Sequence, residues 1–213
     1  MTWNSLLTDD SVTTINKPKN NSGRFLMLDT ETTGFNVMQG DEIIEVGIVE
    51  MINGEFTGNN FHGLYRPFKN IDISAQNVHG ISLFDLEFKP ILNQEEAYKI
   101  LQFINGGDLV IHNAKFDMNF LNHQFKSMGI KFSENVGKII DSLEIARTIY
   151  KGARNSLDAL CDRFEISRDN RGYHGAVVDC LLLGQVFNHL LMNNHSEKSM
   201  LSDSQKINFD KIC

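Results

Sequence analysis

The chain has 213 residues, of which 41% are hydrophobic and 22% charged, so we expect one globular domain rather than two. Its net charge of -7 argues against a general basic coat for nucleic acid, although a few local cations beside metal ions can still hold a polyanion. Three cysteines without C-x-x-C spacing indicate neither a disulfide framework nor a zinc site, which fits the reducing cytoplasm. No stretch approaches the ~20 apolar residues of a membrane span, so we expect a soluble protein.

Residues 1–23 are polar, lack periodicity and have no apolar core of a secretory signal, which predicts a flexible arm. The run from Phe25 to Leu28 is continuously apolar and of strand length, as in a strand covered on both faces. Asp29 and Glu31 follow, and residues two apart on a strand project from the same face. Two like charges this close persist mainly beside something positive, and a divalent cation is the simplest candidate. Because a lone pair of this spacing is usually a solvated strand end, a cation site requires further carboxylates.

The next segment predicts an antiparallel meander. Ile43–Met51 has the pattern of a second strand, Asn53-Gly54 is a strong hairpin turn, and Phe56–Tyr65 has the pattern of a third strand. Glu45 interrupts the apolar run of the second strand. We expect it to be an outward or edge carboxylate, since a buried one would need a partner.

Helices and strands alternate in the rest of the chain. A helix cap at Asn93, with Glu96 three residues later, and a cap at Asp141, with Glu144 three residues later, each have the spacing of a capping box. The expected elements are a short helix at 74–78 before a loop at 79–81, a helix after Asn93 that ends at 105–107, a strand at 109–111, a helix closed by Gly129, a strand at 138–140, a helix after Asp141, a helix from 155 or 156 to 163, and a last helix at 175–191. A meander followed by alternating strands and helices predicts a mixed α/β sheet with helices on both faces.

Two more acids and a histidine fall near helix starts. Asp117 lies in the first turn of its expected helix, where the helix dipole alone could explain a carboxylate. Asp179 lies among apolar neighbours on a largely buried helix, so it needs a compensating charge. His174 precedes Gly175, and from this approach loop it could lean over the same site and take a proton from an activated water. A surface histidine before a helix is the simpler alternative.

The four carboxylates Asp29, Glu31, Asp117 and Asp179 could meet at one edge of the sheet. Hard oxygen ligands select Mg²⁺ or Mn²⁺ over zinc, and partial ligation leaves room for phosphate oxygens. Two such ions can activate a water and neutralise the leaving oxygen of a phosphodiester. The pattern therefore suggests a phosphodiesterase.

These residues also carry a family resemblance. Asp29-x-Glu31 with Thr32-Thr33-Gly34, the segment from His112 to Asp117, and His174-x4-Asp179 look like the three motifs of the DEDDh exonucleases, in order and at similar separations. The segments between the motifs resemble the epsilon proofreading subunits of bacterial DNA polymerase III, and the resemblance covers about residues 24–192.

The resemblance implies a ribonuclease H-like fold with a five-stranded mixed sheet, and an exonuclease domain at 24–192. The implied activity removes nucleotides one at a time from a 3′ end as nucleoside 5′-monophosphates. By position, His174 would be the general base, and two Mg²⁺ or Mn²⁺ ions would be held by Asp29, Glu31, Asp117 and Asp179. The residues that would lie near the terminal nucleotide or shape the wall beside it are Thr32, Gly34, His79, His112 and Asn113. Asp141 is expected to cap its helix and to stay away from the metals.

The implied partners are a single-stranded DNA 3′ end and the catalytic subunit of DNA polymerase III. We expect residues 193–213 to be a short flexible tail where that family has a long linker, and Gln205–Phe209 is a poor match to a sliding-clamp peptide. Two alternatives remain open: an RNA-trimming exonuclease that resembles ribonuclease T, and a catalytically silent nucleic-acid binding module. The complete catalytic set argues against the second.

Overall fold

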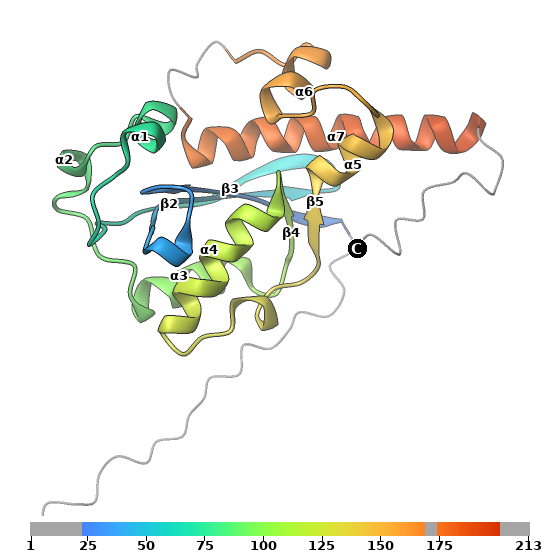
Figure 1. Ribbon diagram of the computed structural model, residues 1–213. Coiled ribbons are helices and arrows are strands. Elements are labelled where there is room, and N and C mark those ends of the chain that lie inside the picture. Colours follow the sequence, from blue (N-terminus) through green and yellow to red (C-terminus); the bar gives the residue numbers. More distant parts are fainter. Residues whose placement is uncertain (1–22, 169–173, 201–213) are drawn as a thin grey trace, which may run out of the picture.

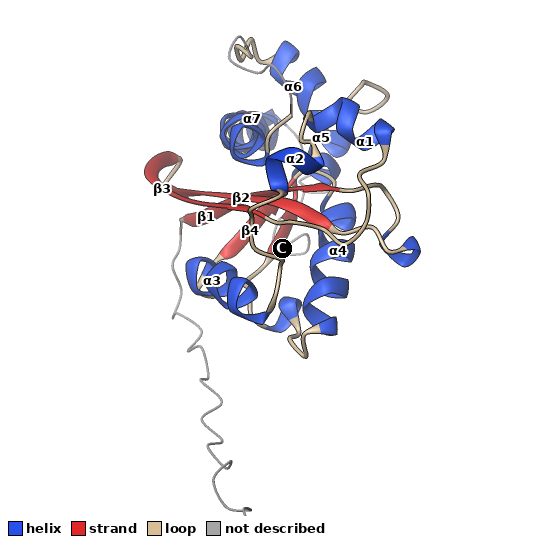
Figure 2. Cartoon of the chain, turned by 90° about the vertical axis from the view of Figure 1, so that its left-hand side faces the viewer, coloured by secondary structure: helices blue, strands red, loops and turns tan. Residues whose placement is uncertain are grey.

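The computed structural model describes residues 23–168 and 174–200, with side chains described as far as residue 193. One sheet lies between two layers of helices (Figures 1 and 2). The strands are β1 Arg24–Thr32, β2 Ile43–Ile52, β3 Glu55–Leu64, β4 Asp108–Ile111 and β5 Ile139–Asp141. The helices are α1 Ile73–His79, α2 Leu83–Leu86, α3 Gln94–Ile104, α4 Ala114–Ser127, α5 Ser142–Ile149, α6 Leu157–Arg163 and α7 Ala176–Met200, with short 3-10 turns at Val37–Gln39 and Phe132–Glu134.

The sheet has the order β3-β2-β1-β4-β5. The β1–β2 and β2–β3 pairs are antiparallel, while β1–β4 and β4–β5 are parallel. The predicted mixed α/β sheet with an opening meander is therefore confirmed. Because β1 is central, its carboxyl end lies beside that of its parallel neighbour β4, and loops after these strands meet at one edge.

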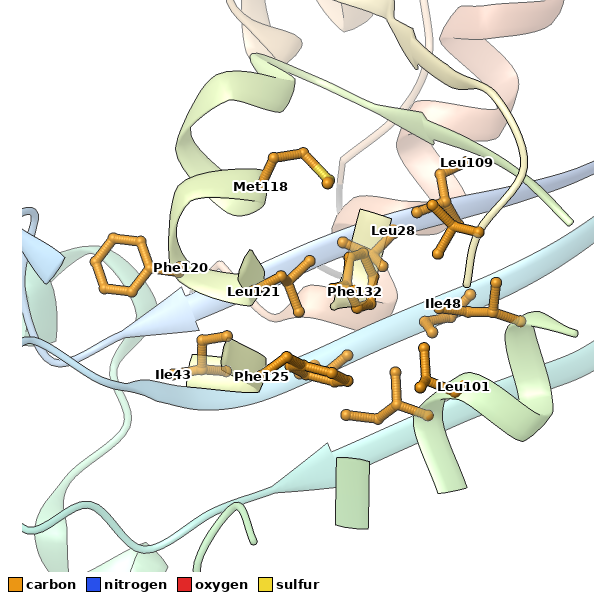
Figure 3. Packing of buried hydrophobic residues seen from close by; sticks show 14 of the residues in the cluster. Leu28, Ile43, Ile48, Leu101, Leu109, Met118, Phe120, Leu121, Phe125 and Phe132 are labelled. Carbon is orange, nitrogen blue, oxygen red and sulfur yellow. The ribbon is translucent and has the colours of Figure 1, made fainter. Parts of the chain in front are cut away.

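Each face of the sheet carries its own hydrophobic cluster. Leu26 and Leu28 pack under α3 and α4, whereas Met27 between them packs under α5, α6 and α7. Figure 3 shows side chains of the first cluster, among them Leu121 and Phe125 from α4. The alternation along β1 follows from the two-residue period of a strand. By the same period Asp29 and Glu31 continue the Met27 face, toward α7, while Thr30 continues the Leu28 face, toward α4.

The helix starts follow the capping logic of the sequence. Asn93 accepts the Glu96 N–H at 3.0 Å, but Glu96 pairs with Lys99 at 2.7 Å, so only half of that expected capping box forms. The cap of α6 is Ser156, which accepts the Ala159 N–H at 3.3 Å. A complete capping box, which the sequence analysis missed, opens α2 between Ser82 and Asp85.

Three expectations need correction. His79 was expected in a loop, but it is the buried last residue of α1. Glu45 was expected at the surface, but it is buried. The stretch Ala176–Asn193 of α7 is long and apolar enough to cross a membrane, with a mean hydropathy of 1.3, although none was expected. Half of that stretch is buried, and Figure 1 shows α7 running lengthwise over the sheet, as the core helix of a globular domain does.

The cysteine prediction can be checked at two positions. Cys161 and Cys180 are buried free thiols. Cys213, the expected arm and the clamp-like segment Gln205–Phe209 lie outside the described residues.

Candidate active site

Three acids come together on the α7 side of the sheet. Asp29 and Glu31 reach this place from β1, as their spacing predicted, and Asp179 reaches it from the first turn of α7. One carboxylate oxygen from each lies within 4.8 Å of those of the other two. All the donors are carboxylate oxygens, the ligands that hard divalent cations prefer. The set therefore suits Mg²⁺ or Mn²⁺ in its chemistry.

The fourth predicted acid stands slightly apart. Asp117 lies in the first turn of α4 and is 3% exposed. Its Oδ1 accepts hydrogen bonds from the Thr30 N–H at 3.0 Å and from the Thr30 hydroxyl at 2.7 Å. Because Thr30 faces α4 while its two neighbours face α7, Asp117 approaches β1 from the opposite side. Burial raises the pKa of Asp117 to about 7, although the bonds from Thr30 oppose that shift.

The charge on this cluster is concentrated. Burial raises the pKa of Asp29 well above its usual range, and the nearby carboxylates of Asp117, Glu31, Asp179 and Glu45 raise it further. Gathering acids in this way costs free energy, which a bound cation would offset. A cluster so unfavourable in itself is typical of a functional site.

His174 is held beside Asp179 by two contacts. Its backbone N–H donates to the Val78 carbonyl of α1 at 3.2 Å, and its Nδ1 lies 3.0 Å from Asp179 Oδ2. The side chain is 39% exposed. The histidine therefore does lean over the acids from the residues that precede α7, as expected.

Glu45 anchors the start of the same helix, which the sequence analysis missed. Its Oε2 accepts the Ala176 N–H at 3.1 Å, and its Oε1 lies 2.7 Å from His62 Nε2 on β3. The available signal was an acid inside an apolar strand, which required a partner. The partner could not be named, since it lies 131 positions away in the chain.

The acids open into a pocket of about 310 Å³. It is lined by Asp29, Thr30, Glu31, Thr32, Phe35, Ala75, Val78, His79, His112, Asn113, Phe116, Asp117, His174 and Asp179. Four of the five residues expected near the terminal nucleotide or its wall thus line it, namely Thr32, His79, His112 and Asn113. Gly34 does not. A Cβ there would lie 2.5 Å from Asp41 Oδ2 and 2.6 Å from Asp72 Oδ2, so this glycine lets the turn after β1 pack closely.

Two histidines, His79 and His112, line the pocket. His79 Nδ1 accepts the Ile81 N–H at 3.0 Å, and burial lowers the pKa of His79. His112 Nδ1 lies 2.9 Å from the Ser142 hydroxyl, and burial lowers the pKa of His112 as well. Both rings therefore favour the neutral form, so they line the pocket without adding positive charge to it.

Asp141 accepts hydrogen bonds at the starts of two helices, α5 and α4. As expected, it caps α5, and its Oδ1 accepts the Leu143 N–H at 2.9 Å. It also accepts the N–H groups of Asn113 at 3.1 Å and Ala114 at 2.9 Å. These bonds hold Asn113 in a left-handed conformation, φ 68°, at the start of α4. Asp141 does not line the pocket, and it supports the helix that carries Asp117.

Comparison with known proteins agrees with this geometry. The exonuclease family model matches residues 26–187. DNA polymerase III subunit epsilon of Pasteurella multocida is 43% identical over 175 residues, covering 80% of this chain and 69% of that protein. The subunit epsilon of Rickettsia conorii is 41% identical over 188 residues, covering 87% and 81%. The subunit epsilon of Buchnera aphidicola from Acyrthosiphon pisum is 42% identical over 200 residues, covering 90% and 83%.

Solved structures share the fold at lower identity. The nuclease domain of 3′hExo, described as a DEDDh family member bound to rAMP, has a TM-score of 0.69 at 16% identity, covering 82% of this chain and 95% of that one. Exonuclease X in complex with 5′ overhanging duplex DNA has a TM-score of 0.60 at 22% identity, covering 85% and 96%. The resemblance drawn from the three motifs is confirmed. The chain therefore belongs to the exonuclease family, within the group formed by the epsilon subunits of DNA polymerase III.

Proposed function

We propose that this chain is the 3′ to 5′ proofreading exonuclease of a DNA polymerase III, releasing nucleoside 5′-monophosphates from DNA 3′ ends. The observation that carries the proposal is the convergence of Asp29, Glu31 and Asp179 beside Asp117, in a chain about 40% identical to epsilon subunits. Epsilon relatives match over most of their length, which favours DNA over the RNA-trimming alternative.

Two divalent cations, Mg²⁺ or Mn²⁺, would be held by Asp29, Glu31, Asp117 and Asp179. When bound, such cations activate the attacking water and neutralise the leaving oxygen of the phosphodiester. The acids fit this task because they are all oxygen donors and repel one another without a cation.

His174 acts in this proposal as the general base. Its Nδ1 is held by Asp179, which orients the ring so that the other nitrogen can accept the proton of the attacking water. The backbone bond from His174 to Val78 fixes this residue against α1. The backbone and ring of His174 are therefore positioned before substrate arrives, which is the condition for efficient proton transfer.

The terminal nucleotide would occupy the pocket beside Thr32, His79 and Asn113. Gly34 would act indirectly, because its lack of a side chain allows the turn after β1 to pack against Asp41 and Asp72. Neutral histidine walls suit a nucleoside, because they offer hydrogen-bonding atoms without attracting the phosphate away from the acids.

The proposed partners follow from the names of the relatives. We infer association with the polymerase catalytic subunit, and hence work in the cytoplasm, from the epsilon subunits that match this chain. The exonuclease domain would be residues 24–192, flanked by arm and tail. Any contact with a sliding clamp would involve Gln205–Phe209, a segment that matches clamp-binding peptides poorly.

The test compares single-stranded DNA and RNA of equal sequence with free 3′ ends, in Mg²⁺, in Mn²⁺ and in EDTA. His174→Ala should lower kcat by about 10²- to 10⁴-fold, the usual contribution of a general base, and should still bind Mn²⁺ in calorimetry. His123→Ala is the matched control, since His123 is exposed on α4 and away from the pocket lining.

Three results would contradict the proposal. Hydrolysis that persists in EDTA would exclude a mechanism that depends on divalent metal ions. Loss of Mn²⁺ binding in His174→Ala removes the general-base assignment. A strong preference for RNA over DNA would move the chain to the RNA-trimming alternative.

A further inference from the structure

Three cations lie on the segment that follows Ser142, the residue that contacts His112 in the pocket wall, in a chain whose net charge is -7. Arg147 is in the last turn of α5, and Lys151 and Arg154 are in the connection from α5 to α6. All three residues are exposed. We call these three residues the basic loop. It is a local positive surface on an acidic molecule, which is where a polyanion would be drawn.

The basic loop is close to the pocket through His112. This ring lines the pocket and contacts Ser142, the first residue of α5. Burial is the main reason that the pKa of His112 is low, but the Arg147 charge lowers it too, and the Asn155 carbonyl opposes the shift. Arg147, and the Asn155 carbonyl that follows Arg154 in the chain, therefore both lie close to a ring that lines the pocket.

The loop is also held in a fixed shape. Asn155 is buried, and its Nδ2 donates to the carbonyls of Tyr150 and Ala153, at 3.1 Å each. Arg163 donates to Asn155 Oδ1 at 3.2 Å and to the Arg154 carbonyl at 3.0 Å, and its guanidinium lies over the Tyr150 ring at 4.4 Å. Arg163 is thus engaged in building the loop. A rigid loop presents its cations with little ordering cost.

The cations of the loop are poorly neutralised. Arg147 faces Glu144 at 3.5 Å, and both side chains are largely exposed, so this pair is weak. Within residues 23–168 and 174–193, Lys151 and Arg154 make no ion pair. The free positive charge is therefore mainly that of these two residues, and it is available to an external anion.

We propose that the basic loop binds backbone phosphates of the single strand that leads to the 3′ terminal nucleotide. This inference rests on the proposed function. The pocket of about 310 Å³ is of a size for the terminal nucleotide and little more, so the rest of the strand must leave past the walls. Phosphate contacts of this kind carry no sequence information, which suits an enzyme that must accept any 3′ end.

The experiment uses the double variant Lys151→Gln/Arg154→Gln in the full chain. We expect the KM for single-stranded DNA to rise about tenfold at moderate salt with kcat little changed. The slope of log(kcat/KM) against log[salt] should become shallower by about 1.4, since each single-strand phosphate contact contributes ~0.7. Hydrolysis of p-nitrophenyl thymidine 5′-monophosphate, which has no strand, should stay unchanged.

Two variants serve as controls. Lys126→Gln/Lys131→Gln removes the same charge near the other end of α4 and should leave both substrates unaffected. Lys151→Arg/Arg154→Lys keeps the charge and should restore the KM for DNA. An unchanged KM and salt slope in the glutamine variant would overturn the inference, and so would an equal loss on the small ester, because the loop would then only support the pocket. If the unsubstituted protein hydrolyses neither substrate, the proposed function fails and the inference with it.

Discussion

Replacing Glu45 by alanine tests how the start of α7 is held. The substitution leaves the buried Ala176 N–H without its acceptor, which costs about 1–3 kcal/mol. The contact with His62 adds little, ~0–1 kcal/mol, because that ring is 45% exposed. Against these losses, removing Glu45 relieves one of the charges that raise the pKa of Asp29. We expect a net destabilisation of about 2 kcal/mol, or roughly 4–8 °C in Tm for a chain of this size.

The assay is thermal unfolding followed by circular dichroism in EDTA, with kcat measured in parallel in Mg²⁺. Since Ala176 comes two residues after His174, kcat should fall with KM for DNA nearly unchanged. Glu45→Gln keeps an oxygen acceptor for the Ala176 N–H and should recover most of both losses. His62→Ala should cost less than 1 kcal/mol. An alanine variant as stable and active as the unsubstituted protein, or a glutamine variant as poor as alanine, would refute the anchoring role.

Two further predictions concern close packing and charge. Gly47→Ala should destabilise the protein by about 1–3 kcal/mol and lower its activity, because the new Cβ would lie 2.5 Å from the Ala176 carbonyl carbon. Gly175→Ala is the control and should change Tm by little, because the space around its Cβ is open. Equal effects of the two substitutions in unfolding experiments would disprove this packing. In EDTA the pKa of Asp117, about 7, exceeds its unfolded value of roughly 3.9, so the folded state binds more protons and its stability falls as pH rises toward 7. Asp117→Asn cannot ionise, so its Tm relative to the unsubstituted protein should increase from pH 5 to pH 7.5, and a constant difference would rule out the raised pKa.

The sequence predicted those features that depend on local spacing. The pattern around β1 identified a strand covered on both faces, and the two faces carry separate clusters, with Leu26 and Leu28 on one side and Met27 on the other. The same period brought Asp29 and Glu31 to one side. Local spacing also identified the caps at Asn93 and Asp141, because a capping side chain and the N–H group that donates to it lie within three residues of each other.

Features that depend on distant partners could not be predicted in this way. Asp117 was grouped equally with the other acids, but which face of β1 it approaches is decided by where α4 lies relative to the sheet. The burial of Glu45 depends on α7 crossing β2, a contact between segments far apart in the chain. Helix α2 was missed for another reason: it has only four residues and exposes Phe84, so it shows no apolar period despite its capping box.

The supporting contacts explain how the helices that carry Asp117 and Asp179 are kept in place. Lysine or arginine side chains bound directly to these acids would compete with divalent ions for the same oxygens. The structure instead fixes the helices, using Asp141 to bind the N–H of Ala114 and Glu45 to bind the N–H of Ala176. A carboxylate at a helix N-terminus is favourable by itself, since it satisfies free N–H groups and faces the positive end of the helix dipole. The helix starts are thereby held by additional negative charge, and the field that would attract the cations is strengthened by the same residues that position the site.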